Sequence, residues 1–266
     1  MGYNSIVLVK QVPDTANISG EVMKPDGTVN RAKLPAIFNP EDKVALELAL
    51  QVKDDMGGKV TAVTMGPPKA AELLKECLYM GADDVILITD RKFAGADTLA
   101  TSYVLQKVIE KIGDYDLIFA GRQAIDGDTA QVGPQTAEKL GLPQITYTEK
   151  ILNIKKGKIK VQRQIDGGHE ILESTLPVLL TVINDAAIPR PFKAKKAMAY
   201  KNYVPPQWTT EDLSVDIDRC GMPGSPTKVH KIESVVLSAG DHEEIEPSKA
   251  GLGELIDKLM NDHIFG

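Results

Sequence analysis

The sequence predicts an α/β protein built on a doubly wound, mostly parallel β-sheet, with an antiparallel hairpin excursion and a C-terminal arm. Three observations lead to this prediction. Apolar strand-like segments alternate with helical segments four times over residues 5–140, a loop punctuated by glycine joins the last of these strands to its helix, and short strands separated by tight turns follow Pro143. Strands that alternate with helices pair in parallel through right-handed crossovers, which place helices on both faces of the sheet.

The first strand is predicted at Ser5–Val9, a continuous apolar run of the kind that is buried on both faces of a parallel sheet. An irregular segment, 10–38, follows, because prolines and glycines break any periodicity there. A loop of this length directly after a first strand is usually functional. The alternative is a small hairpin that covers the edge of the sheet.

Helices and strands then follow one another in a regular order. Asn39 and Pro40 predict the start of a helix, because asparagine caps a helix and proline is favoured at its first position, and Gly57-Gly58 predicts its end. The buried face of this helix carries Val44, Leu48 and Val52. The elements predicted next are the strand Val60–Met65, the helix Lys69–Met80, the strand Asp84–Ile88, a long helix capped by Asp97 or Thr98, and the strand Leu117–Ala120.

The loop from Gly121 to Gly133 leads into a helix that Gly141 ends. Because Pro134 is tolerated only in a first helical turn, the helix begins between about Thr129 and Gly133, and the N–H groups of these residues have no partner within the helix. Converging N–H groups and the helix dipole favour a phosphate. The alternative is a helix that is capped by Asp128, with Gln131 reaching back, and binds no ligand. The small side chains at 129–133 favour the phosphate site.

The expected position of a ligand follows from the sheet. In open α/β sheets, ligands bind at the carboxyl ends of the strands, where the order of the strands reverses. The chain segments that follow Val9, Met65 and Ala120 are therefore expected to meet at one site.

The pattern changes after Pro143. The segments Ile145–Ile154, Lys158–Ile165 and Glu170–Thr175 are strand-like and are separated by Lys156-Gly157 and by Asp166-Gly167-Gly168, which are typical of hairpin turns. They predict an antiparallel excursion. The apolar run Pro177–Val182 is expected to return as a parallel strand.

Beyond Asn184 the sequence no longer has the pattern of a core. Residues 185–208 contain four prolines and the basic run Lys193–Lys196, which predicts an extended arm. A last helix is predicted at Gly251–His263, with an apolar stripe that needs a partner chain or the body of the protein to pack against, the partner being favoured. We therefore expect two parts, an α/β domain at 1–184 and a partner-binding arm at 185–266. The stripe consists of Leu252, Leu255, Ile256 and Leu259.

Composition excludes several classes of function. The 266-residue chain is long enough for a full core, and its net charge of −6, with basic residues mostly scattered, makes nucleic acid an unsuitable partner. Cys77 and Cys220 lie far apart and predict neither a disulfide framework nor a metal site. No apolar run approaches the roughly 20 residues of a membrane span, so a cytoplasmic location is expected. No nucleophile or acid–base pair stands out, so no catalytic residue is predicted.

The sequence AGRQAIDGDTAQVGP, which begins at Ala120, resembles the nucleotide loop of the β subunit of electron-transferring flavoproteins. The likeness extends over nearly the whole chain. The version of the loop here, DGDTAQVGP, is similar to that of the electron-bifurcating group of the family. Further segments that resemble the family are LVKQVPDT near the start, NPEDKVALELAL at 39–50, TMGPPKA at 64–70, MGADDVILITD at 80–90, IDGGHE at 165–170 and LPVLLTVINDAAIPRP at 176–191.

The resemblance implies an adenine-nucleotide-binding fold and a set of cofactor-binding positions. It also implies that a flavin-dependent dehydrogenase docks on Ala186, Ala187 and Ile188, although this chain has small residues where many members present a leucine. Small side chains in the nucleotide loop allow the close backbone approach that a pyrophosphate needs. The implied cofactor-binding residues are Leu8, Asn39, Asp42, Met65, Gly121, Arg122, Gln123, Ala124, Asp126, Gly127, Asp128, Thr129, Ala130, Gln131, Val132 and Gly133.

The resemblance to the bifurcating group also implies a reaction. FAD in this chain would accept a hydride from NADH, and the electrons would divide between the FAD of an α subunit with its dehydrogenase and ferredoxin or flavodoxin, or flow in reverse. One alternative is a non-bifurcating β subunit that holds a structural AMP. A second alternative is an ATP-sensing nucleotide-binding module on the same scaffold, because fold alone does not determine function.

Overall fold

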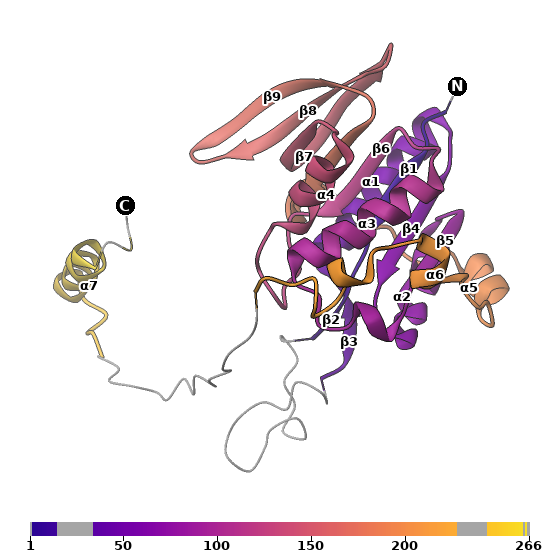
Figure 1. The fold of residues 1–266 in the computed structure, drawn as a ribbon. Coiled ribbons are helices and arrows are strands. Elements are labelled where there is room, and N and C mark those ends of the chain that lie inside the picture. Colours follow the sequence, from indigo (N-terminus) through magenta and orange to yellow (C-terminus); the bar gives the residue numbers. More distant parts are fainter. Residues whose placement is uncertain (1, 15–33, 228–243, 263, 265–266) are drawn as a thin grey trace.

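The computed structural model describes residues 2–14, 34–227, 244–262 and 264 (Figure 1). These residues form a nine-stranded sheet in the order β11-β5-β4-β1-β6-β10-β7-β8-β9 and a separate two-stranded ladder, β2-β3. The strands of the large sheet are β1 (Ser5–Leu8), β4 (Val60–Met65), β5 (Asp84–Ile88), β6 (Leu117–Gly121), β7 (Gln144–Lys155), β8 (Lys158–Ile165), β9 (Gly168–Thr175), β10 (Val178–Val182) and β11 (Gln207–Trp208). The helices are α1 (Pro40–Met56), α2 (Ala71–Met80), α3 (Thr98–Ile112), α4 (Val132–Leu140), α5 (Ala194–Tyr200), α6 (Thr210–Leu213) and α7 (Lys249–Asn261).

The predicted fold class is confirmed. Every pairing from β11 to β7 is parallel, whereas β7 with β8 and β8 with β9 pair antiparallel, as the hairpin turns predicted. The chain builds the sheet outward from β1 to β4 and β5, and then returns to add β6 on the other side of β1. The order of the strands therefore reverses between β1 and β6, which is where such sheets bind ligands.

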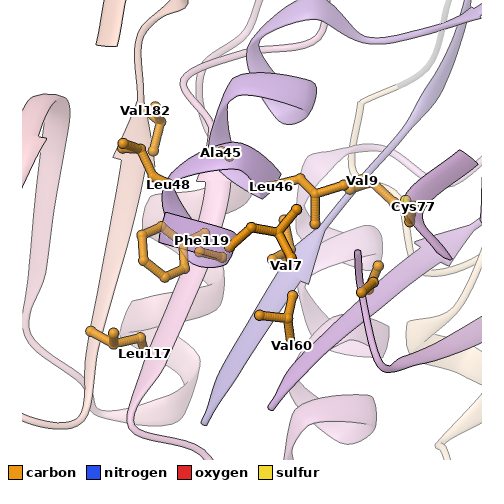
Figure 2. Packing of buried hydrophobic residues seen from close by; sticks show 14 of the residues in the cluster. Val7, Val9, Ala45, Leu46, Leu48, Val60, Cys77, Leu117, Phe119 and Val182 are labelled. Atoms are coloured by element: carbon orange, nitrogen blue, oxygen red, sulfur yellow. The ribbon is translucent and has the colours of Figure 1, made fainter. Parts of the chain in front are cut away.

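Alternate residues of the central strands enter two separate cores. Val7 and Phe119 pack with α1 and α2 on one face of the sheet (Figure 2), whereas Ile6 and Ile118 pack with α3 on the other. Side chains of adjacent strand residues point to opposite faces, so a sheet covered on both sides needs continuous apolar strands. This explains why the strands of this chain are apolar throughout.

The predicted helix boundaries match the structure closely at α1. Asn39 is the N-cap, Pro40 is the first helical residue, and the chain leaves the helix at Gly57 with a φ of 77°. In the long segment 10–38, the described residues form β2 (Gln11–Pro13) and β3 (Ala36–Phe38), an antiparallel pair as in the hairpin alternative. Residues 15–33 lie outside the described part of the chain.

The segment 185–208 is more ordered than its composition predicted. It contains α5, and β11 pairs in parallel with β5 at the end of the sheet. The register is fixed by Leu87 N–H, which donates to Pro206 O at 2.9 Å, and by Thr89 N–H, which donates to Trp208 O at 3.0 Å. A two-residue strand has no periodicity to read, and its pairing depends on the open edge of β5. The assignment of 185–266 to a partner-binding arm stays a prediction.

The last helix, α7, presents the predicted apolar stripe to solvent. Leu252 is 56% exposed and Ile256 is 50% exposed, and Figure 1 shows the helix standing apart from the sheet. Among the helices that the structure describes, none combines the length and the hydropathy needed to cross a bilayer.

Candidate functional site

A cavity of about 910 Å³ opens at the carboxyl ends of β1, β4, β5 and β6. It is lined by residues from the segments that follow Val9, Met65 and Ala120, so the structure brings together the segments that the topology was expected to gather. Of the cofactor-binding residues predicted from the sequence, all except Asn39 and Asp126 line this cavity. Their role as ligands of a nucleotide stays a prediction.

The first turn of α1 holds the loop after β6 in place. Asn39, fully buried, donates from Nδ2 to Gln123 O at 2.8 Å and accepts from Ile125 N–H at 3.2 Å. Glu41 accepts from Gln123 N–H at 2.8 Å, and its other oxygen lies 3.1 Å from Arg122 Nη2. Asn39 therefore shapes the loop from behind instead of lining the cavity.

Asp42 joins the ends of β1 and β6 beneath the cavity. Its side chain is buried, and its carboxylate accepts from Gly121 N–H at 2.9 Å and from Lys10 N–H at 2.8 Å. Burial raises the pKa of Asp42 to about 7, against these hydrogen bonds and one from Asn39, which favour the charged form. A side chain at position 121 would overlap Asp42, so glycine is required there by close approach.

The start of α4 keeps its backbone donors free. Gln131 is the N-cap without a side-chain capping bond, and within the described residues the N–H groups of Thr129, Ala130 and Gln131 have no hydrogen-bond partner. The alternative of an Asp128–Gln131 capping box is not realised. Asp128 instead accepts from Gln123 Nε2 at 2.9 Å, and Gln131 Oε1 accepts from Thr98 Oγ1 at 2.9 Å.

The approach to α4 is conformationally strained. Asp128 and Ala130 adopt positive φ values of 49° and 52°, a region that residues with a side chain seldom occupy. Such strain persists only where the surroundings enforce it, and it is common at binding sites. Together with the free donors, this geometry fits an anion at the start of α4.

The glycines of the loop differ in what they do. A Cβ at Gly133 would lie 2.7 Å from Thr181 Cγ2, so this residue is small because α4 packs closely on β10. A Cβ at Gly127 would meet nothing within 4 Å. Small size at position 133 is thus explained by packing, in addition to any approach of a ligand.

Asp126 has a partner outside the loop. Both of its carboxylate oxygens accept from Lys10 Nζ, at 2.7 and 2.8 Å, so the ion pair connects the segment after β1 with the segment after β6. Lys10 itself lines the cavity and was not predicted from the sequence. Neither was Glu41, whose contacts join segments about 80 residues apart.

Sequence reasoning also missed one wall of the cavity, which is formed after β5 by residues 89–91 and 93–97. This wall is held by the segment that follows β11. Thr210 Oγ1 donates to Asp90 Oδ2 at 2.7 Å, and Thr227 N–H donates to Asp97 Oδ2 at 3.1 Å. The rule that ligands bind at strand ends, applied to Ile88 as well as to the other strands, would have found this wall.

The predicted docking residues lie away from the cavity. Ala186 ends a short 3-10 turn, η5 (Asn184–Ala186), and Ile188 is 92% exposed. Arg190 anchors this segment to α1, because its Nε and Nη2 lie 2.8 and 3.0 Å from the carboxylate oxygens of Glu47 and its Nη1 lies 2.7 Å from Asp54. A docking function for these residues stays a prediction.

Within the residues that the structure describes, no group of three or more histidine, cysteine, aspartate or glutamate residues is placed to hold a metal ion. Cys77 and Cys220 are both free and buried.

Comparison with known proteins identifies the family. Residues 26–206 match the electron transfer flavoprotein domain. The chain is 44% identical over 260 residues to an electron transfer flavoprotein subunit beta from Clostridium acetobutylicum, covering 98% of this chain and 99% of the relative. It is 44% identical over 278 residues to the acryloyl-CoA reductase electron transfer subunit gamma from Anaerotignum propionicum, covering 97% and 98%. It is 43% identical over 263 residues to subunit CarD of the caffeyl-CoA reductase–Etf complex from Acetobacterium woodii, again covering 97% and 98%. With both the domain match and these full-length relatives, the chain belongs to the electron transfer flavoprotein family.

Proposed function

We propose that the chain is the β subunit of an electron-bifurcating electron transfer flavoprotein and that its cavity holds FAD. The observation that carries this proposal is the cavity at the reversal of the strand order, where free backbone donors at the start of α4 face a space of about 910 Å³. Ligand pockets for small molecules span roughly 300–1,000 Å³, so this cavity lies at the upper end and favours a dinucleotide over AMP.

The residues present fit such a cofactor. The N–H groups of Thr129, Ala130 and Gln131 supply donors for a pyrophosphate, and the dipole of α4 favours its charge. Arg122 lines the cavity, and its guanidinium is held there by Glu41, whose carboxylate lies 3.1 Å from Nη2. Leu8, Met65 and Val132 supply apolar walls that exclude water.

The chemistry that bound FAD would supply is the uptake of a hydride from NADH and the separate release of its two electrons, one to a high-potential acceptor and one to a low-potential acceptor. The protein contributes position and electrostatics. Asn39, Glu41 and Asp42 fix the loop and the strand ends around the cofactor, which keeps the donors of α4 pre-oriented. No side chain of this chain needs to act as a nucleophile or as an acid–base catalyst.

The proposal includes specific partners. An α subunit with its own FAD forms the obligate heterodimer, a flavin-dependent dehydrogenase docks through Ala186, Ala187 and Ile188, and ferredoxin or flavodoxin receives the low-potential electron, all in the cytoplasm. Two of the relatives are named as subunits that act with acryloyl-CoA reductase and caffeyl-CoA reductase, which is consistent with an acceptor of the enoyl-CoA reductase class. The flow of electrons in the reverse direction uses the same parts.

The test is the extraction of nucleotides from the purified heterodimer of this chain with its α subunit. Two FAD and no AMP per heterodimer are expected, together with NADH-dependent reduction of ferredoxin. One FAD and one AMP would contradict the proposal, because the cavity would then hold a structural nucleotide in a one-flavin electron carrier.

A further inference from the structure

Two walls of the cavity are held by different kinds of contact. The wall after β6 is tied to the first turn of α1 by three buried polar side chains. The wall after β5 is formed by residues 89–91 and 93–97, and among residues 89–97 only Phe93 is buried. Within the described structure, the hydrogen bonds that join residues 89–97 to segments beyond the adjoining helix α3 all go to residues 206–227, which we call the strap.

The strap meets this wall at points spread along its length, and the contacts are hydrogen bonds. More than half of the residues of the strap are exposed. The hydrogen bonds run from Thr210 Oγ1 to Asp90 Oδ2 at 2.7 Å, from Met222 N–H to Ala94 O at 3.0 Å and from Asp97 N–H to Ser225 Oγ at 2.8 Å. A single hydrogen bond contributes little net stability, so the strap is held by several modest contacts.

The strap and the wall also share an apolar core. Leu213 and Cys220 of the strap are buried in the same cluster as Phe93 of the wall, on the face of the sheet that α3 covers. Apart from these side chains, the wall and the strap bury few apolar groups, whereas the strands beneath the cavity are buried along their length. Regions with few buried apolar contacts open at the lowest cost in free energy. The wall and the strap are therefore the part of the cavity that opens first.

We propose that the strap is a latch on the cavity, and that its separation from the wall after β5 opens the cavity for exchange of the bound nucleotide. This inference rests on the proposed function, because it takes a nucleotide to occupy the cavity. Loops that close over a ligand commonly set the rate at which it is released. The strap thus controls how long the cofactor is retained, although none of its residues lines the cavity.

A latch has a kinetic signature that a static support lacks. If the nucleotide passes only through the open state, a weaker latch raises the rate constants of association and dissociation by the same factor and leaves the Kd unchanged. A strap that only supports the wall would act differently. Its weakening would raise the dissociation rate constant, and with it the Kd, while the association rate constant stayed the same.

The first experiment locks the latch with an engineered disulfide. A Cβ at Gly95 would lie 3.4 Å from Met222 Cβ, near the roughly 3.8 Å that is typical of a disulfide. The variant G95C/M222C is therefore expected to link the wall to the strap on oxidation. Its reduced form is the reference, so that effects of the substitutions themselves cancel. M222C alone, treated with the same oxidant, controls for oxidation of Cys77 and Cys220, which are buried.

The measurement is nucleotide exchange in the purified heterodimer of this chain with its α subunit, followed by rapid filtration with radiolabelled FAD and radiolabelled AMP. The FAD of the α subunit is the internal reference, because its exchange rate should be the same in every variant. Release from this chain is expected to be at least tenfold slower in oxidised G95C/M222C than in the reduced form, and reduction should restore it.

The second experiment weakens the latch. T210V keeps the shape of Thr210 and removes the hydroxyl that donates to Asp90, and S225A removes the acceptor of Asp97 N–H. Each variant should raise both rate constants about fivefold, as for the loss of one hydrogen bond, and leave the Kd within about twofold of the unmodified value. E211Q is the matched control, because Glu211 is an exposed residue of the strap, and it should exchange nucleotide as the unmodified protein does.

Oxidised G95C/M222C that exchanges nucleotide as fast as its reduced form would overturn the inference. So would T210V and S225A with unchanged rate constants. A raised Kd at an unchanged association rate constant would also overturn it, because the strap would then be a static support. All three results leave the proposed function standing. A heterodimer with one FAD and one AMP would instead overturn the proposed function, and the exchange of AMP would then test the latch.

Discussion

Asp42 places a buried carboxylate at the point where β1, β6 and α1 meet. Burial raises its pKa from the ordinary aspartate value of 3.8 to about 7, so the folded protein binds this proton more tightly than the unfolded chain does. The stability that this proton contributes is complete below about pH 4 and is lost as the pH rises through 7. Because the carboxylate links two strand ends at the cavity, this titration acts where the cofactor is proposed to bind.

The first prediction concerns the variant D42N, which removes the titration. Between about pH 5 and 8, the free energy of unfolding of the unmodified protein should fall more steeply than that of D42N, by up to about 1.4 kcal/mol per pH unit. Urea denaturation at several pH values measures both slopes. Equal slopes would show that the pKa of Asp42 is the same in the folded and the unfolded states.

At the scale of elements, the packing of α4 against β10 depends on the absence of a side chain at position 133. The Thr181 methyl group occupies the space that a Cβ would need, and both residues are buried. Since α4 carries the donors for the proposed pyrophosphate, a shift of this helix would move them as well.

The second prediction is that G133A lowers the free energy of unfolding by about 1–3 kcal/mol, as is usual when a well-packed interior is overfilled. T181S should restore most of this loss in the double variant, because serine lacks the methyl group and keeps the hydroxyl that accepts from Tyr147 N–H. G127A is the control and should change stability by less than about 0.5 kcal/mol, because its Cβ faces open space. Urea denaturation distinguishes these cases, and equal effects at 127 and 133 would contradict the packing argument.

The elements that could be predicted from the sequence are those whose start, end and type are determined by their own residues and direct neighbours in the chain. The strand β6 is a continuous apolar run that ends at a glycine, and α1 starts at an asparagine followed by proline, so both were found. The strand β11 was not, since two residues pair there only because β5 offers a free edge. Helix α5 was missed for a similar reason: its composition is that of a basic linker, and it packs against α2.

The same distinction applies to the candidate site. The loop from Gly121 to Gly133 has a local signal in its glycines and in Pro134, and it was predicted. Glu41 and Arg91 have no local signal, because their position at the cavity depends on how distant segments meet. Contacts between side chains about 80 residues apart follow from the topology of the sheet. The periodicity of the sequence therefore does not predict them.

For the whole molecule, the chain beyond β10 has two structural roles. The stretch from 206 to 227 is part of the body, since β11 extends the sheet and Thr210 and Thr227 hold the cavity wall. Helix α7 differs, because its apolar stripe is exposed in the described structure. An apolar face of this kind is stable in solution only when another surface covers it. Within the proposed function, that surface belongs to the α subunit.

The last prediction tests this assignment with the double variant L252D/I256D, whose two positions lie one turn apart on α7. Burying each of these side chains contributes about 1.5–3 kcal/mol, so the Kd of the heterodimer should rise at least 100-fold. The thermal unfolding of the isolated chain should not change, because both side chains are exposed there. D257S, at another exposed position of the same helix, is the control and should bind the α subunit normally. Analytical ultracentrifugation measures the association. If the double variant binds the α subunit as tightly as the unmodified chain, α7 does not contribute to the interface.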